Sequence, residues 1–118
     1  GRGRQLGIPT ANIDYPKEKL EPRHGVYACV AWCGGKPYRA ITNFGVRPTF
    51  SGSARPALET HILDFSGSLY GEVVHVDFVA WVREERKFGD VESLKAQVLA
   101  DIDAVRGMKF IPVGGALV

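Results

Sequence analysis

Short apolar runs separated by turn-forming residues make up most of the chain. Along residues 73–82 every second position is apolar, namely Val74, Val76, Phe78, Ala80 and Val82. A period of two predicts a strand whose one face lies in the core. Further strands are predicted at 26–32 and 38–43, joined by a hairpin turn at Gly34-Gly35. The pattern therefore predicts a β-rich domain.

A strand predicted at 57–63 carries an unusual mixture of side chains. Its alternation puts Leu58, Thr60 and Ile62 on one face and Glu59, His61 and Leu63 on the other. Proline, glycine and serine predict loops between the strands. We expect loops at 13–23, 45–50 and 51–56, and a turn at 66–68.

A single helix is predicted near the end of the chain. Apolar residues recur at steps of three and four, namely Val91, Leu94, Val98, Ile102 and Val105. Asp90 is a suitable N-cap, Glu92 complements the helix dipole in the first turn, and Gly107 is a stop signal. The apolar face is expected to pack on the strands, with a partner-binding groove as the alternative.

Five or six strands followed by one helix predict a small closed antiparallel barrel with the helix across one side. The 118 residues suit one domain spanning 1–118, in which the tail 108–118 is uninformative. No apolar run approaches the roughly 18 residues of a membrane span, and the first residues contain no apolar signal region. We therefore expect no membrane partner.

The net charge and the cysteines only weakly constrain the ligand and the cellular compartment. A net charge of +2 suits an anionic small molecule and gives no argument for a nucleic-acid surface. Cys29 and Cys33 lie four strand residues apart, about 13 Å, which is too far for a disulfide. Unpaired thiols fit a reducing, cytoplasmic compartment. The three histidines are scattered and match no zinc-site spacing.

The first twelve residues predict a phosphate site. Gly1, Gly3 and Gly7 let backbone N–H groups approach an anion, and Arg4 adds positive charge. The oxygens of Thr10 and Asn12 are ligands that Mg²⁺ accepts beside phosphate. The spacing matches neither the dinucleotide fingerprint nor a Walker loop. A flexible basic stretch followed by an ordinary turn therefore remains an alternative.

Glu59 is the candidate acid or base. A carboxylate within an otherwise apolar strand either has a structural partner or a catalytic role, and both interpretations stay open. His61 shares its face and could neighbour the site. Tyr70 and Phe88 could stack on a planar ligand or fill the edge of the core. The mixed charges at 83–87 suit a solvated strand end with ion pairs.

In their order along the chain, several motifs together resemble the riboflavin kinase (flavokinase) family. They are Gly-Arg-Gly-Arg-Gln-Leu-Gly-Ile-Pro-Thr-Ala-Asn at 1–12, Gly-Val-Tyr at 25–27, Thr-Asn-Phe-Gly-Val-Arg-Pro-Thr-Phe at 42–50, Leu-Glu-Thr-His-Ile-Leu-Asp-Phe at 58–65, Leu-Tyr-Gly at 69–71 and Val-Arg-Glu-Glu-Arg-Lys-Phe at 82–88. With the terminal helix, the resemblance covers nearly the whole chain up to Arg106.

The resemblance implies a six-stranded antiparallel Greek-key barrel with a C-terminal helix. It implies transfer of the ATP γ-phosphate to the 5′-hydroxyl of riboflavin, which gives FMN. Thr10 and Asn12 would coordinate Mg²⁺ and phosphate, and Glu59 would be the catalytic base. The glycine-rich lead, Gly1, Gly3, Arg4 and Gly7, would form a flap near the ATP phosphates. Residues expected towards the flavin are Tyr70, Arg83, Glu85 and Phe88.

In bacteria this kinase is usually the C-terminal half of a bifunctional FAD synthetase, whose other half is an adenylyltransferase with a His-x-Gly-His-type signature. That signature is missing from this sequence, so the chain is expected to carry the kinase alone, with an upstream domain in the full-length protein. The family's strand before the glycine-rich motif is missing, and Ser68 stands where the family often has Asp. The alternative function is a non-catalytic flavin- or nucleotide-binding barrel. An oligonucleotide-binding barrel is disfavoured by the weak charge.

Overall fold

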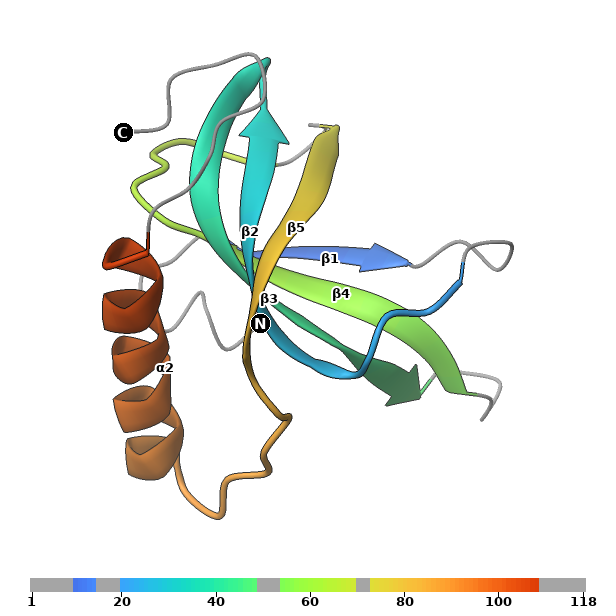
Figure 1. Ribbon diagram of the computed structural model, residues 1–118, viewed down its shortest axis with the longest axis vertical. Coiled ribbons are helices and arrows are strands. Elements are labelled where there is room, and N and C mark those ends of the chain that lie inside the picture. The colour runs from blue at the N-terminus through green and yellow to red at the C-terminus, as the bar shows by residue number, and fades with distance from the viewer. Residues whose placement is uncertain (1–9, 15–19, 49–53, 70–72, 109–118) are drawn as a thin grey trace.

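Five antiparallel strands and one helix form the described part of the chain, which a computed structural model gives for residues 10–14, 20–48, 54–69 and 73–108 (Figure 1). The strands are β1 (Thr10–Asp14), β2 (Gly25–Cys33), β3 (Lys36–Pro48), β4 (Ala54–Ile62) and β5 (Val74–Arg83), and the helix is α2 (Val91–Arg106). They form one sheet in the order β1-β4-β3-β2-β5. The mainly β antiparallel class with a C-terminal helix is therefore confirmed.

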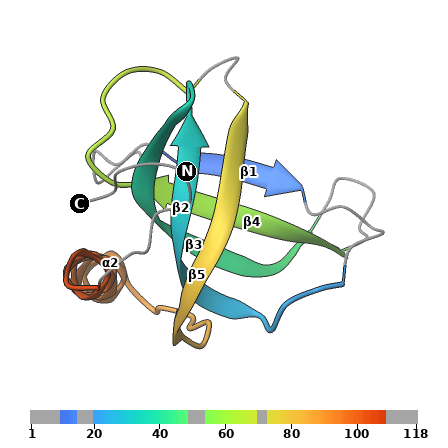
Figure 2. The same cartoon turned by 45° about the horizontal axis from the view of Figure 1, so that its top comes forward.

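The sheet is strongly curled, and β1 and β4 run across the direction of β2 and β5 (Figures 1 and 2). The long strand β3 belongs to both parts, because it pairs with β2 over Lys36–Phe44 and with β4 over Ala40–Pro48. The described residues supply five strands of a barrel-like fold. The sixth strand and the Greek-key closure stay predictions.

Both faces of β2 are buried, and each contributes to a separate apolar cluster. The helix-side cluster consists of Val26, Ala28, Val30, Ile41, Leu63 and Val105. The inner cluster, which joins the two crossed parts of the sheet, consists of Cys29, Ala31, Cys33, Ala40 and Ile62. Alternation along β2 explains the division, because successive side chains point to opposite faces of a strand. The helix α2 lies on one side of the sheet and covers the first cluster (Figure 2).

The prediction that β5 buries one continuous face is wrong. Val74 and Val76 pack on the inner cluster, whereas Ala80 and Val82 pack on the helix-side cluster. The register explains the change of face, because Cys29 pairs with Phe78 and Ala28 with Ala80, which leaves an extra residue on β5. Such a β-bulge reverses the alternation beyond it. Phe78 itself is 37% exposed.

Several predicted element ends are also wrong. β1 includes Ile13 and Asp14, which were expected in a loop, and β3 continues through residues 45–48. β4 starts at Ala54 and ends at Ile62, so residues 54–56 are not a loop and Leu63 belongs to the following turn. Pro56 pairs with Val46 of β3, and the described pairing of β4 with β1 covers residues 57–61. The remainder of the predicted loop at 51–53 lies outside the described residues.

The hairpin and the helix follow the local sequence signals closely. Gly34 and Gly35 form the β2–β3 turn with φ values of 58° and 79°, a conformation that favours glycine. The Ser93 backbone N–H donates to Asp90 Oδ1 at 2.7 Å, which confirms the N-cap, and α2 ends at Gly107.

The predicted apolar face of α2 is buried mainly in the second half of the helix, where Ile102 and Val105 contact the helix-side cluster. Val91 is 67% exposed and does not share this burial, so that part of the prediction is wrong. In the described part of the chain, no helix is long and apolar enough to cross a membrane.

Candidate active site

Three strands bring polar side chains into one row across the sheet. Asn12 on β1 lies directly opposite Glu59 on β4, and Glu59 lies opposite Asn43 on β3. In the neighbouring row, Thr10 lies opposite His61. Residues directly opposite in an antiparallel pair point to the same face, so the pairing gathers these side chains on one surface. The predicted site residues Thr10, Asn12 and Glu59 are therefore close in space although they are far apart in sequence.

The alternation in β4 explains why Glu59 and His61 face this surface. Leu58, Thr60 and Ile62 are buried on the opposite face, as predicted. Thr60 satisfies its buried hydroxyl through a hydrogen bond with Thr42, whose Oγ1 lies 3.0 Å away. The inward side of the strand is thus apolar or internally paired, and the outward side keeps the titratable groups.

His61 bridges the two candidate functional groups. Its Nδ1 lies 3.1 Å from Thr10 Oγ1, and its Nε2 lies 3.4 Å from Glu59 Oε1. The side chains of His61 and Glu59 are 13% and 27% exposed. A contact of 3.4 Å is at the long end for a hydrogen bond, so His61 orients Glu59 without forming a tight ion pair with it.

A cavity of about 750 Å³ lies beside this row and has the volume of a small-molecule site. Its walls come from β2, β3, β4, the end of β5, the segment 84–88 and α2. Four of the residues predicted for the site line it, namely Glu59, Arg83, Glu85 and Phe88. Thr10 and Asn12 lie next to it on β1 through their pairing with His61 and Glu59.

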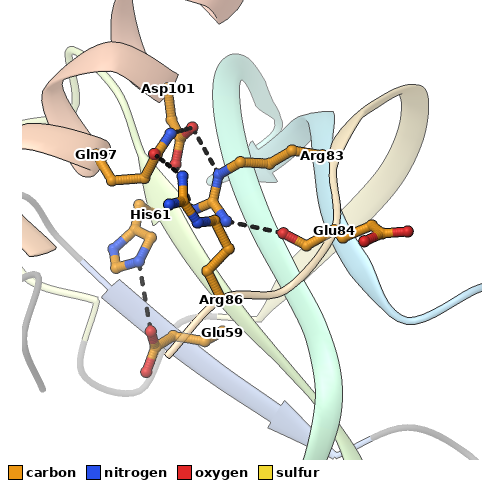
Figure 3. A network of polar contacts seen from close by, with 7 residues as sticks. All are labelled: Glu59, His61, Arg83, Glu84, Arg86, Gln97 and Asp101. Atoms are coloured by element: carbon orange, nitrogen blue, oxygen red, sulfur yellow. Dashed lines mark hydrogen bonds and ion pairs between the residues drawn. The ribbon is translucent and has the colours of Figure 1, made fainter. Parts of the chain in front are cut away.

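Arg83 is held in a network of polar contacts with α2 (Figure 3). Its Nε and Nη2 donate to Asp101 Oδ1 and Oδ2 at 2.9 and 2.8 Å, and its Nη1 donates to the Glu84 carbonyl at 2.9 Å. Gln97 donates to Asp101 Oδ1 at 3.0 Å and accepts from Arg86 at 3.0 Å. The guanidinium of Arg83 is thus already used by protein groups, and it anchors the segment 84–88 to the helix.

The charged segment at 83–87 therefore contains two kinds of ion pair. Arg23 and Glu84 form an exposed pair at 2.8 Å, as expected for a solvated strand end. The pair between Arg83 and Asp101 differs, because Asp101 is only 5% exposed. The prediction of solvated ion pairs is thus right for Glu84 and wrong for Arg83.

Glu85 lies against the backbone of β3. A Cβ atom added to Gly45 would lie 2.7 Å from Glu85 Cδ, closer than real Cβ contacts allow. Glycine at this position thus makes room for the carboxylate in the cavity wall.

The cysteines and the remaining predicted site residues say less about the site. Burial raises the pKa of the Cys29 thiol to about 12. Cys29 and Cys33 form no disulfide, as predicted, and both are buried. Cys29 is thus protonated at neutral pH and is no nucleophile. Among the described residues no group of three or more His, Cys, Asp or Glu could hold a metal ion. Five predicted site residues lie outside the described part of the chain, namely Gly1, Gly3, Arg4, Gly7 and Tyr70.

Sequence reasoning missed Asn43, Gly45 and Asp101. Asp101 carries a usable signal, because it interrupts a helix face otherwise made of apolar residues such as Val98 and Ile102. Asn43 ends the strand predicted at 38–43 and Gly45 follows it, and neither residue carries a local signal of function. Their proximity to Glu59 and Glu85 depends on the pairing of β3 with β4 and on the path of the segment 84–88.

Comparisons with known proteins show the family of the chain. Residues 1–109 match the family model described as riboflavin kinase. The bifunctional riboflavin kinase/FMN adenylyltransferase of Pseudomonas fluorescens is 40% identical over 105 residues, which cover 89% of this chain and 33% of that protein. The RNA-binding riboflavin kinase RibR of Bacillus subtilis is 38% identical over 103 residues, covering 87% of this chain and 44% of that protein.

A solved structure is also similar. It is described as a macrolide-efflux protein from Streptococcus pneumoniae, has a TM-score of 0.80 and is 34% identical, and the match covers 92% of this chain and 35% of that one. The chain thus spans between about a third and somewhat under half of the length of the proteins it matches.

Proposed function

The chain belongs to the riboflavin kinase family, and we propose on that basis that it transfers the γ-phosphoryl group of ATP to the 5′-hydroxyl of riboflavin, giving FMN and ADP. The observation that carries the proposal is the pairing of Thr10 and Asn12 with His61 and Glu59 beside a cavity of about 750 Å³. Phosphoryl transfer requires charge neutralisation on one side of the reacting atoms and orientation of the attacking hydroxyl on the other. Thr10 and Asn12 on β1 would serve the first task, and Glu59 on β4 would serve the second.

Glu59 accepts the proton of the 5′-hydroxyl in this proposal. It lines the cavity, and its Oε1 lies 3.4 Å from His61 Nε2. A general base must come within hydrogen-bond distance of the proton that it removes. His61 limits the freedom of the carboxylate and thereby favours a productive orientation.

Thr10 and Asn12 fit a Mg²⁺ ion bound with the nucleotide. They occupy alternate positions on β1 and so share one face, and both supply neutral oxygen atoms. When His61 Nε2 carries the proton and points it at Glu59, Nδ1 accepts the hydroxyl proton of Thr10. In that tautomer Thr10 Oγ1 is the donor towards His61, and its oxygen has the character that a metal ligand requires. The ion would neutralise charge on the phosphate oxygens.

The segment 84–88 and α2 form the flavin side in this proposal. Phe88 is partly buried at the cavity, with the Arg86 guanidinium 5.8 Å from its ring centre, and offers a planar surface for the flavin ring. Glu85 is a polar contact, and Arg83 positions the segment through Asp101. Tyr70 would add to this wall, and Gly1, Gly3, Arg4 and Gly7 would cover the phosphates.

The chain corresponds in this proposal to the kinase part of a bifunctional protein. The relative in Pseudomonas fluorescens is named for two activities, and the present chain covers 33% of it. A closed six-stranded Greek-key barrel is part of the same proposal. A cytoplasmic location agrees with the two free cysteines.

Incubation with riboflavin and Mg-ATP, followed by chromatographic detection of FMN, tests the function. FMN formation that depends on both ATP and Mg²⁺ is expected. Riboflavin binding, followed by flavin fluorescence, is measured in parallel. Intact binding without any FMN would contradict the kinase and favour a passive flavin-binding module.

A further inference from the structure

Asn43 lies at the β3 end of the polar row. It is directly opposite Glu59, and both side chains line the same cavity. Side chains in this relation have Cβ atoms about 4.5–5.5 Å apart. A ligand group that reaches the Glu59 carboxylate therefore comes within reach of the Asn43 amide as well.

The amide oxygen of Asn43 lacks a partner. Oδ1 is buried, and no hydrogen-bond donor contacts it among the described residues. Burying an amide oxygen without a donor is unfavourable, and nearly all such atoms in proteins are paired. Because Asn43 lines the cavity, a rotation of its amide brings Oδ1 to a bound molecule, which is expected to supply the missing donor.

The chemistry of the atom defines the group that it takes. An amide oxygen only accepts hydrogen bonds, so its ligand must present an O–H or N–H group. The phosphate oxygens of a nucleotide are themselves acceptors at neutral pH and do not qualify. A polyol chain does, because each of its hydroxyls carries a proton.

We propose that Asn43 is a substrate-binding residue whose Oδ1 accepts a hydrogen bond from the ribityl hydroxyl next to the reacting one, the 4′-hydroxyl. The inference rests on the proposed function, since it places the 5′-hydroxyl at Glu59. Two groups on adjacent strands then hold two adjacent hydroxyls of one chain. This arrangement fixes the rotation of the terminal carbon and selects a hydroxylated chain over a bare alkyl chain.

Binding of riboflavin and of 4′-deoxyriboflavin to the wild-type protein and to Asn43→Leu tests the proposal, with the dissociation constants measured by flavin fluorescence. Leucine has nearly the volume of asparagine but no polar atom. The wild type is expected to bind 4′-deoxyriboflavin about 5- to 10-fold more weakly than riboflavin, as the loss of one hydrogen bond implies. Asn43→Leu is expected to bind the two flavins equally well, with an unchanged dissociation constant for Mg-ADP.

The 3′-deoxy analogue serves as the matched control, because its loss of affinity is expected to be the same in both proteins. Equal binding of riboflavin and 4′-deoxyriboflavin by the wild type would overturn the proposal, whatever the stability of the variant. A preference that survives in a folded Asn43→Leu variant would overturn it too. FMN formation by the wild type tests the function separately, so failure of the inference and failure of the kinase assignment are distinguishable.

Discussion

Two pairs, each of a carboxylate and a basic side chain, line the same cavity (Figure 3). They differ in the length of their contacts, in burial and in the elements that they join. Arg83 and Asp101 form a two-pronged ion pair at 2.8 and 2.9 Å, and Asp101 is buried. Glu59 and His61 approach only to 3.4 Å. The first pair joins β5 to α2, whereas the second lies within a single strand.

The difference shows how firmly each carboxylate is held by its basic partner. Both oxygens of Asp101 accept hydrogen bonds from Arg83, and Oδ1 also accepts one from Gln97, so this carboxylate is committed to the fold. Removing one member of such a pair leaves a buried charge without compensation. The contact of Glu59, the proposed base, with His61 is longer, at 3.4 Å, and lies at the cavity wall. The role of a carboxylate in a cavity is thus better inferred from its hydrogen-bond partners than from its position alone.

The largest effect is expected from Glu59→Gln. The amide keeps the shape of the side chain but cannot take a proton, so kcat for FMN formation should fall by about 10²- to 10⁴-fold. The midpoint of urea unfolding should stay close to that of the wild type, because glutamine keeps the size of the side chain and its ability to accept hydrogen bonds. Full turnover by the folded variant would remove Glu59 from the role of base.

The next largest effect is expected from Asp101→Asn. Arg83 loses its counter-charge in a partly buried position, and the free energy of unfolding should drop by about 3 kcal/mol in urea titrations. Activity measured well below the melting temperature should change far less than in Glu59→Gln. A loss of stability below about 1 kcal/mol would mean that the pair contributes no more than a surface ion pair.

Two substitutions of His61, each of which keeps one of its two contacts, are expected to have effects of intermediate size. His61→Asn keeps an acceptor near Thr10, whereas His61→Gln keeps a donor near Glu59. We expect His61→Gln to weaken Mg²⁺-dependent ADP binding, measured by calorimetry, by about 10-fold, the size of one well-placed metal-supporting contact. His61→Asn should bind Mg-ADP nearly normally and lower kcat instead. The reverse order would contradict the division of roles between the two ring nitrogens.

The smallest effect is expected from Gln97→Ala. Gln97 links Asp101 to Arg86 at the outer end of the network, so its loss removes one hydrogen bond on each side. Chemical denaturation should report a loss of roughly 1 kcal/mol. Since Arg86 borders the cavity, the KM for riboflavin should rise before kcat falls. A loss as large as that of Asp101→Asn would show that the network acts as one unit.

Local signals in the sequence predicted a large part of the fold. The hairpin at Gly34-Gly35, the strand β2 and the capped helix α2 each depend on neighbouring residues, and the structure confirms them. Glu59 also stood out locally, because a charged residue in an apolar strand requires an explanation. Its role as base stays a prediction.

The remaining features depend on contacts between distant segments. β1 is too short and polar to be recognised by itself, and it is a strand because it pairs with β4, with Thr10 opposite His61. The bulge in β5 reverses a face that a strict period of two would keep, and only the pairing with β2 reveals it. Asn43 became a candidate through its position opposite Glu59 and its unpaired oxygen.

Because β3 is paired on both sides, the part of the site that it carries should open only rarely. Residues 40–44 are paired on both sides, with β2 and with β4, so their amide protons should exchange with solvent only in rare, extensive openings. Opening this stretch requires both of its neighbours to separate from it, so the wall that contains Asn43 should last as long as the sheet itself.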